Sequence, residues 1–314
     1  YDNLTMTTTA ASLQLQATAN RERSMRSIIW YQFRRHHMAV VGAIILLLLV
    51  LGAFLAPLSP YDPENSSLRE RDEPPSLLHP MGTDSLGRDM LTRLLYGGRI
   101  SLTIGLLATT LGITIGTTIG ALSGFYGGHT DNFLMRLTDL FLTLPRLFML
   151  IIMTLLLRTL DLPGMDLLRA NGGVGGIILI LGILSWTGTA RLVRGQFLGL
   201  KEKEFVEAAR TLGISNIRIV FRHVLPNTAT PVIVAATLLV AGTIISESGL
   251  SYLGFGVQQP TPTWGNMLNS AQDEMLKGHW WMAFFPGLMI FLTVISINYI
   301  GDGLRDALDP RKLQ

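Results

Sequence analysis

The chain contains six apolar stretches, each long enough to cross a bilayer as a helix of about 20 residues. They lie near residues 38–57, 100–126, 133–157, 174–198, 229–246 and 281–300. A short polar turn, Gly127 to Asp131, separates the second stretch from the third, which predicts an antiparallel pair of helices. The pattern therefore predicts an all-α membrane protein with six transmembrane helices.

The polar segments between these stretches divide the chain into regions. We expect an N-terminal tail at 1–37, whose first 23 residues carry no assigned function, and an uncleaved first span at 38–57. An external segment follows at 58–99 and ends in an amphipathic helix, Asp89 to Arg99, lying along the outer membrane face. The core, at 100–301, holds spans two to six and a large inner loop at 201–227. A C-terminal tail, 302–314, completes the chain.

Composition supports a membrane protein, since 48% of the residues are hydrophobic, only 15% are charged and the mean hydropathy is +0.39. The chain has no cysteine, which excludes a disulfide framework, thiol catalysis and cysteine-ligated metal. Of the 25 Lys and Arg residues, 16 lie on the side of the two termini and eight on the opposite side, while Arg146 lies within the third span. This asymmetry predicts that both termini are cytoplasmic. Because the insertion rule accounts for the basic clusters, we expect no nucleic-acid partner.

The second span carries a small residue at every fourth position: Ala108, Gly112, Gly116, Gly120 and Gly124. On a helix, this repeat forms one groove that a neighbouring helix can approach closely. We predict that this face packs against protein rather than lipid.

Charged residues within or near the ends of the predicted spans include Asp139, Arg146, Arg191 and Glu247. Arg191 lies near the inner end of its span, and Asp139 lies three residues after Arg136, a spacing suited to an ion pair within one helix. Glu247 has no cation nearby in sequence, so it is the best candidate for lining a solute pathway. The Gly- and Pro-rich segment after it predicts an outer constriction, with Ser251, Leu253 and Gly254 as further candidates.

No pattern predicts catalysis by this chain. The histidines lack metal-ligand spacing, no P-loop occurs, and no Ser/His/Asp set is evident, so we expect no catalytic and no metal-binding residues. If the protein moves a solute uphill, the energy comes from another protein.

The inner loop has the pattern of two short helices on the membrane surface. Phe205, Ala208, Ala209 and Leu212 fall on one side of a first helix, and Gly213 can end it in the left-handed conformation. Ser215 or Asn216 can cap a second helix that runs to Leu225, where Pro226 discourages continuation. Taken alone, this pattern also fits a helix bound to the lipid surface.

The residues Glu207-Ala208-Ala209, then Gly213 and then Leu225-Pro226 resemble the EAA loop of binding-protein-dependent ABC importer permeases. Residues 82–89, 250–265 and 301–310 agree with the same family, and the match runs from about Ser24 to the end of the chain. Arg222 to Asn227 is similar to the peptide-transporter branch, although His223 stands where the family usually has an apolar residue. The chain therefore resembles a C-type permease subunit of a dipeptide or oligopeptide importer.

The resemblance implies the type I ABC importer permease fold in the cytoplasmic membrane of a bacterium or archaeon. It implies pairing with a second, homologous permease, two cytoplasmic ATPase subunits that bind ATP and Mg, and an external peptide-binding protein; this chain itself would hold no cofactor. The residues implied for coupling to the ATPase are Glu207, Ala208, Ala209, Gly213, Leu225 and Pro226. In the external segment, we expect Asp84, Arg88 and Asp89 to contact the binding protein.

Three alternatives stay open at the level of sequence. The same branch could carry nickel, glutathione or another small solute such as an oligosaccharide. A stand-alone secondary transporter is disfavoured because only Asp139 and Glu247 lie within spans as carboxylates and no internal duplication is evident. A membrane scaffold without transport is disfavoured by the glycine stripe and the outer motifs.

Overall fold

The computed structural model describes residues 25–160 and 163–308, with side chains from residue 29 onward. The expectation for residues 1–23 therefore lies outside the described residues. The helices are α2 Met25–Arg35, α3 His37–Leu55, α4 Met90–Tyr126, α5 Gly128–Thr143, α6 Arg146–Thr159, α7 Met165–Leu184, α8 Trp186–Leu200, α9 Glu204–Thr211, α10 Asn216–Ile219, α11 Ala229–Tyr252, α12 Trp264–Ser270, α13 Gln272–Leu276 and α14 Trp281–Ala307. Within the described ranges there is no strand, so the all-α class is confirmed.

Five helical segments of the described chain are long and apolar enough to cross a membrane: His37–Leu58, Met90–Tyr126, Met165–Leu200, Asn216–Tyr252 and Trp281–Ala307. A sixth crossing requires α5 and α6 together, and these two helices meet at an angle of 91°. The prediction of an uninterrupted third span at 133–157 is therefore wrong. The break follows from Pro145, which lacks an N–H to donate and holds Leu144 in an extended conformation, with ψ at 132°.

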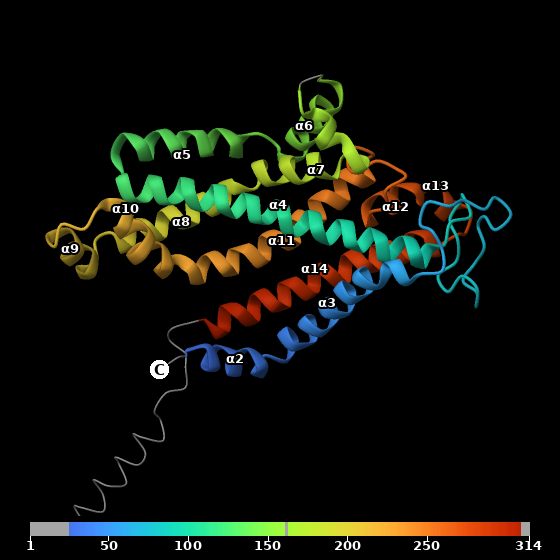
Figure 1. Cartoon of the computed structure of the whole chain (residues 1–314), viewed down its shortest axis with the longest axis horizontal. Coiled ribbons are helices and arrows are strands. Elements are labelled where there is room, and N and C mark those ends of the chain that lie inside the picture. The colour runs from blue at the N-terminus through green and yellow to red at the C-terminus, as the bar shows by residue number, and fades with distance from the viewer. Residues whose placement is uncertain (1–24, 161–162, 309–314) are drawn as a thin grey trace, which may run out of the picture.

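Helix α4 runs along the centre of the bundle and packs against α3, α7, α8 and α11 (Figure 1). Its first turns include residues 90–99, so the amphipathic helix predicted along the outer membrane face is instead continuous with the second span. Asp89 caps this 37-residue helix by accepting a hydrogen bond from the Thr92 amide at 2.7 Å. At the other end only Gly127 links α4 to α5, because the rest of the predicted turn forms the first turn of α5.

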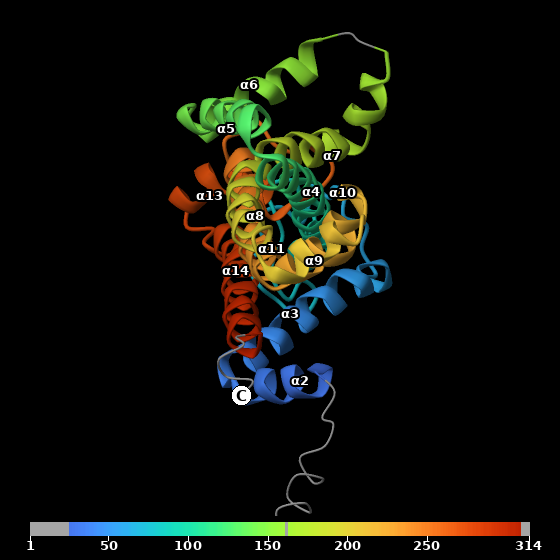
Figure 2. The same ribbon diagram turned by 90° about the vertical axis from the view of Figure 1, so that its left-hand side faces the viewer.

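The two ends of the bundle carry different segments. Helices α9 and α10 lie at one end, where α2 packs against the C-terminal part of α14 (Figures 1 and 2). The segment between α3 and α4 lies at the opposite end, together with α12 and α13 (Figure 1). The first and last described helices thus come together on the side of the inner loop.

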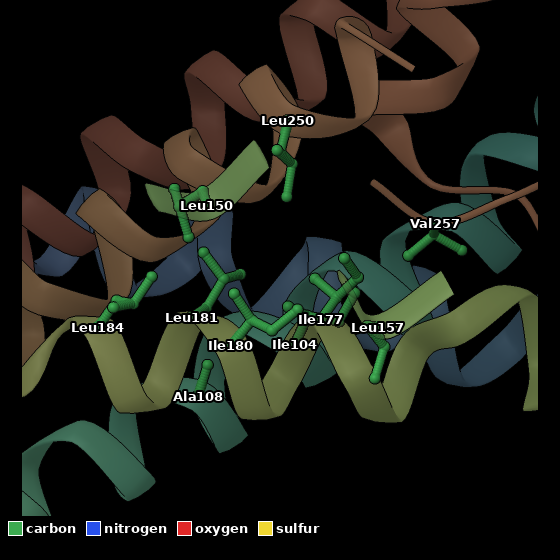
Figure 3. Packing of buried hydrophobic residues seen from close by; sticks show 10 residues of the cluster. All are labelled: Ile104, Ala108, Leu150, Leu157, Ile177, Ile180, Leu181, Leu184, Leu250 and Val257. Atoms are coloured by element: carbon green, nitrogen blue, oxygen red, sulfur yellow. The ribbon is translucent and has the colours of Figure 1, made fainter. Parts of the chain in front are cut away.

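The largest apolar cluster lies where α4, α6, α7 and α11 meet. Ile177, Ile180 and Leu181 of α7 are buried there against Ile104 of α4 and Leu150 of α6 (Figure 3). Burial of branched aliphatic side chains from four helices fixes the bent α6 against the bundle.

The inner loop differs from its predicted form in two ways. The buried face of α9 consists of Val206 and Ala209, whereas Phe205 and Leu212 are exposed. Pro226 does not end the second helix, since the chain continues through a π-helical turn at Val220–Val224 and a 3₁₀ turn at Leu225–Thr228 into α11. Proline is accepted there because it occupies the first turn of the 3₁₀ segment, where its missing N–H has no partner to lose.

Candidate functional site

Helix α9 has one face against the protein and one face open. Val206 and Ala209 pack into a cluster with Val193 and Phe197 of α8 and with Ile219. On the open side lie Glu207 and Ala208, which are exposed, and the large apolar residues Phe205 and Leu212, which are 41% and 79% exposed. This eight-residue helix thus has apolar groups on both faces, and one of the faces is not covered by any described residue.

The bend after α9 depends on the backbone of Gly213. Its φ is +71°, and its amide donates to the Arg210 carbonyl at 2.9 Å while the next amide, of Ile214, donates to the Ala209 carbonyl at 3.1 Å. A Cβ at Gly213 would meet no atom within 4 Å, so the requirement for glycine is conformational rather than steric. Gly213 therefore sets the direction in which α10 leaves α9.

The second half of the loop adds further exposed apolar side chains. Ile217 and Phe221 are largely exposed, and together with Leu225 and residues of α4 that include Leu122 and Tyr126 they line a shallow apolar hollow. Pro226 is exposed beside it. Of the coupling residues suggested by the resemblance, Ala209 is buried against α8, while the others lie on or next to an open, largely apolar surface at one end of the bundle.

The loop is attached to the bundle by charged side chains as well as by apolar packing. The Arg210 guanidinium lies 5.7 Å from the centre of the Phe125 ring, at the end of α4. Arg194 of α8 forms a two-pronged ion pair with Asp131 of α5, and Asp131 also accepts a hydrogen bond from Ser123. These contacts join α9 to the end of α4, and they join α5 to both α4 and α8 at the same end of the bundle.

Glu247 lies buried at the opposite end of α11. Its carboxylate accepts hydrogen bonds from Ser251 at 2.8 Å and from Ser101 of α4 at 3.3 Å, and the Ser101 hydroxyl oxygen in turn accepts from the Trp264 amide. Glu247 and Ser251 thus lie inside the chain, while Leu253 and Gly254 are exposed. All four residues were predicted to lie near one outer constriction. In the structure, two of them are buried where α11 packs against α4 and α12, and the other two are exposed on the protein surface.

The three residues expected to contact an external partner are also turned inward. Asp84 accepts hydrogen bonds from the Leu86 and Arg88 amides and from the Arg88 side chain at 2.7 Å. Asp89 caps α4 and contacts His79 at 2.9 Å. Asp84, Arg88 and Asp89 are all buried, so their geometry favours a role in holding the segment between α3 and α4 in its conformation over direct contact with a partner.

The charges within the spans pair differently from the prediction. Asp139 accepts a hydrogen bond from Arg191 of α8 at 2.5 Å, so the expected pair between Asp139 and Arg136 is wrong. Both side chains of this pair are more than half exposed. The helical spacing is compatible with a local pair, but α5 packs beside α8, and this packing brings Arg191, 52 positions away in the sequence, next to Asp139.

The glycine stripe of α4 lies against α8. A Cβ on Gly116 would lie 2.6 Å from the Trp186 carbonyl oxygen, and one on Gly120 would lie 2.5 Å from that of Ala190. Gly124 is buried against the same helix, whereas Gly112 is buried against Gly182 and Ser185 at the junction of α7 and α8. Backbone-to-backbone approach of this kind is available only to residues without a side chain.

One cluster of possible metal ligands was not foreseen. Asp72 lies in the segment between α3 and α4, which we call the outer segment. Glu274 and His279 lie about 200 positions later, yet the ligand atoms of all three residues are within 4.8 Å of one another. No local spacing in the sequence signals a site made from two distant segments.

Comparisons with known proteins match nearly the whole chain. Residues 116–314 match the family described as binding-protein-dependent transport system inner membrane component, and residues 24–77 match the N-terminal TM domain of oligopeptide transport permease C. The chain is 41% identical to the dipeptide transport system permease protein DppC of Bacillus subtilis (strain 168), covering 90% of this chain and 84% of that protein. It is 42% identical to the glutathione transport system permease protein GsiD of Escherichia coli O157:H7, covering 90% and 89%.

A solved structure shares the fold at low sequence identity. A chain of the MetNI methionine ABC transporter, in an inward-facing form, aligns with a TM-score of 0.55 and 18% identity, over 70% of this chain and 98% of that one. At this identity, the likeness concerns the fold.

Proposed function

Because this chain belongs to the family of binding-protein-dependent transport system inner membrane components, we propose that it is a permease subunit of an ATP-driven importer of dipeptides or oligopeptides. The chain is a multi-pass membrane protein, and family membership implies partners that hydrolyse ATP and bind the solute. In this proposal it forms half of the pathway with a second, homologous permease, and it holds no cofactor of its own.

The observation that carries the proposal is the two-sided α9. Its inner face, Val206 and Ala209, is fixed to α8, and its outer face offers Glu207, Ala208 and the exposed ring of Phe205 to another protein. Two cytoplasmic ATPase subunits, which carry ATP and Mg, would dock one on each permease. Closure of the ATPase pair around ATP would push on α9, and the contacts of Arg210 and Arg194 would pass this motion to α4, α5 and α8.

The same arrangement supports the proposed orientation. The inner loop, α2 and the end of α14 lie at one end of the bundle, and the charge asymmetry of the sequence assigns this end to the cytoplasm. The segment 59–89, α12 and α13 would then face an external peptide-binding protein. Leu77 and Leu78 of that segment are among its most exposed side chains and are better placed for such contact than the buried Asp84.

Glutathione is a second candidate solute, since the chain is as similar to a glutathione permease as to a dipeptide permease. Glutathione is itself a small peptide, so both solutes require a pathway that accepts a peptide backbone and free carboxylates. We propose dipeptides or oligopeptides as the solute because residues 24–77 match the N-terminal domain of an oligopeptide permease.

A pull-down tests the proposal. The tagged chain is solubilised from its native membranes in mild detergent, its partners are identified by mass spectrometry, and ATP hydrolysis is measured on the eluate. We expect a second permease, ATPase subunits and a peptide-binding protein, with hydrolysis lost in the Glu207→Lys variant. A chain recovered alone, from membranes shown to contain those partners, contradicts the proposal and favours a secondary transporter or a scaffold.

A further inference from the structure

Two segments of the outer end meet at Asp72, Glu274 and His279. Asp72 precedes α4 by 18 positions, Glu274 lies on α13, and His279 lies between α13 and α14. The three ligand atoms lie within 4.8 Å of one another, and the side chains of Asp72, Glu274 and His279 are 20%, 8% and 23% exposed. The cluster is therefore largely enclosed by the chain rather than spread over its surface.

Imidazole Nδ1 of His279 lies between the two carboxylates. It is 2.9 Å from Glu274 Oε2 and 3.7 Å from Asp72 Oδ1. The shorter distance is a hydrogen bond, whereas Asp72 Oδ1 is shielded from solvent and has no hydrogen-bond partner among the described residues. A buried carboxylate oxygen without a hydrogen bond is costly, so this atom is suited to binding a metal cation.

We propose that Asp72, Glu274 and His279 bind one divalent transition-metal ion, with Zn²⁺ as the ion that fits best. One imidazole and two carboxylates are ligands that Zn²⁺ accepts, and three protein ligands leave a fourth position for water. With metal-to-ligand distances of about 2.0–2.2 Å, the ligand atoms of a tetrahedral site lie roughly 3.5 Å apart. The separations of 2.9 and 3.7 Å from His279 Nδ1 bracket that value, and the two carboxylate oxygens lie within 4.8 Å of each other, so side-chain rotations that draw the carboxylates together form the site.

Binding requires the lone pair of His279 Nδ1. The ring proton then moves to Nε2, and the hydrogen bond to Glu274 is replaced by two metal–ligand bonds to the same ion. Metal binding therefore breaks the hydrogen bond between His279 and Glu274, and it gives Asp72 Oδ1 a bond to the metal ion.

Two cations border the cluster and hold the other carboxylate oxygens. Lys277 donates to Glu274 Oε1 at 2.7 Å, and Arg71 donates to Asp72 Oδ2 at 3.1 Å. Their positive charges lower the affinity for a metal ion, but both side chains are more than half exposed, so water screens them. They also direct Oε2 and Oδ1 toward His279, which is the orienting role that groups behind metal ligands have.

The ion would join the outer segment to the start of α14. His279 lies against Trp281, with ring centres 5.2 Å apart, and Trp281 Nε1 donates to the Thr83 carbonyl of the outer segment at 3.0 Å. A metal bridge beside this contact would hold the segment 59–89 against the α13–α14 junction. Its role would be to stabilise the outer end, separate from any solute.

The test uses the full chain, purified in detergent through a tag without histidine and stripped with EDTA. Zn²⁺ is titrated by calorimetry, melting temperature is followed in parallel, and Co²⁺ absorption reports the ligand geometry. We expect one Zn²⁺ per chain and a raised melting temperature, with affinity lowered about tenfold or more in Asp72→Asn and in His279→Gln. The exposed His129, in the first turn of α5, supplies the matched control His129→Gln, which should bind as the wild type does.

Two results would overturn the proposal: no saturable binding to the wild type, or equal affinity in the wild type and the two ligand variants. Either would leave the cluster as a network of ion pairs. Because Asp72→Asn and His279→Gln change different segments, a folding defect in one leaves the other as the test.

Discussion

Arg194 on α8 donates two hydrogen bonds to the carboxylate of Asp131 on α5, from Nε to Oδ1 and from Nη2 to Oδ2, each 2.6 Å long. The two residues are 63 positions apart and both are partly shielded, at 35% and 15% exposure. A planar guanidinium matches a carboxylate in this way and an ammonium group does not. This pair fixes the start of α5, next to the surface proposed to receive the ATPase.

Arg194→Lys should weaken this junction although the charge is kept. The loss of the second hydrogen bond is expected to lower the free energy of unfolding by about 1 kcal/mol, an amount reduced by the partial exposure of the pair. Thermal melting in detergent measures it. The more exposed pair of Arg191 and Asp139 gives the control, and Arg191→Lys should shift the melting temperature less. An equal shift in both variants would show that the two-pronged geometry does not matter.

Gly116→Ala should separate α4 from α8. The new Cβ would lie 2.6 Å from the Trp186 carbonyl oxygen and from Thr189 Cβ, so a backbone has to move, at a cost of about 1–3 kcal/mol. Gly188→Ala on the facing helix is the control, because nothing lies within 4 Å of its added Cβ. We expect a lower melting temperature for Gly116→Ala alone, and equal melting of the two variants would refute the close packing of these helices.

The two faces of α9 predict opposite defects. Val206→Asp places a carboxylate in a fully buried apolar site, so it should unfold the loop and expose it to proteolysis. Phe205→Asp changes the exposed face and should leave the melting temperature unaltered while reducing recovery of the ATPase subunits. Limited proteolysis and copurification distinguish the two. If Phe205→Asp retained the full amount of ATPase, the exposed face would not be the docking surface.

Glu247 is expected to matter as a hydrogen-bond acceptor. Glu247→Leu leaves the Ser101 and Ser251 hydroxyls without their acceptor inside the chain, at a cost of about 1–3 kcal/mol. Glu247→Gln keeps one acceptor oxygen and the same shape, so it should melt close to the wild type. A Glu247→Leu variant as stable as Glu247→Gln would contradict this role, and loss of uptake in a fully stable Glu247→Gln would support the predicted pathway role instead.

Much of the fold followed from the sequence because apolar length and glycine spacing are local signals. The spans, the register of the glycines on α4 and the turn at Gly213 all lie within single segments, so periodicity and backbone preference suffice to predict them. The 91° bend was not predicted, although Pro145 is visible in the sequence and the residue before a proline favours an extended backbone. The residues on both sides of Pro145 form one long apolar run, and the length of such a run does not show where a helix inside it breaks.

The pairings between segments could not be read from local spacing. Asp139 joins Arg191 rather than Arg136, and Asp72 meets His279 across more than 200 positions. The inner loop shows the same limit, because Phe205 and Val206 are neighbours of similar polarity and only the position of α8 decides which one is buried. The sequence motif is enough to locate the inner loop, but packing against α8 determines which face of α9 is exposed.

The most direct measurement is ATP-dependent uptake of a labelled dipeptide into proteoliposomes that contain this chain, its companion permease and the ATPase subunits, with the binding protein outside. The account predicts uptake that needs ATP inside and falls to background in Glu207→Lys, while Glu202→Lys, an exposed charge reversal just before α9, retains it. Uptake that continues without the ATPase subunits, or that is the same in Glu207→Lys and Glu202→Lys, would contradict it.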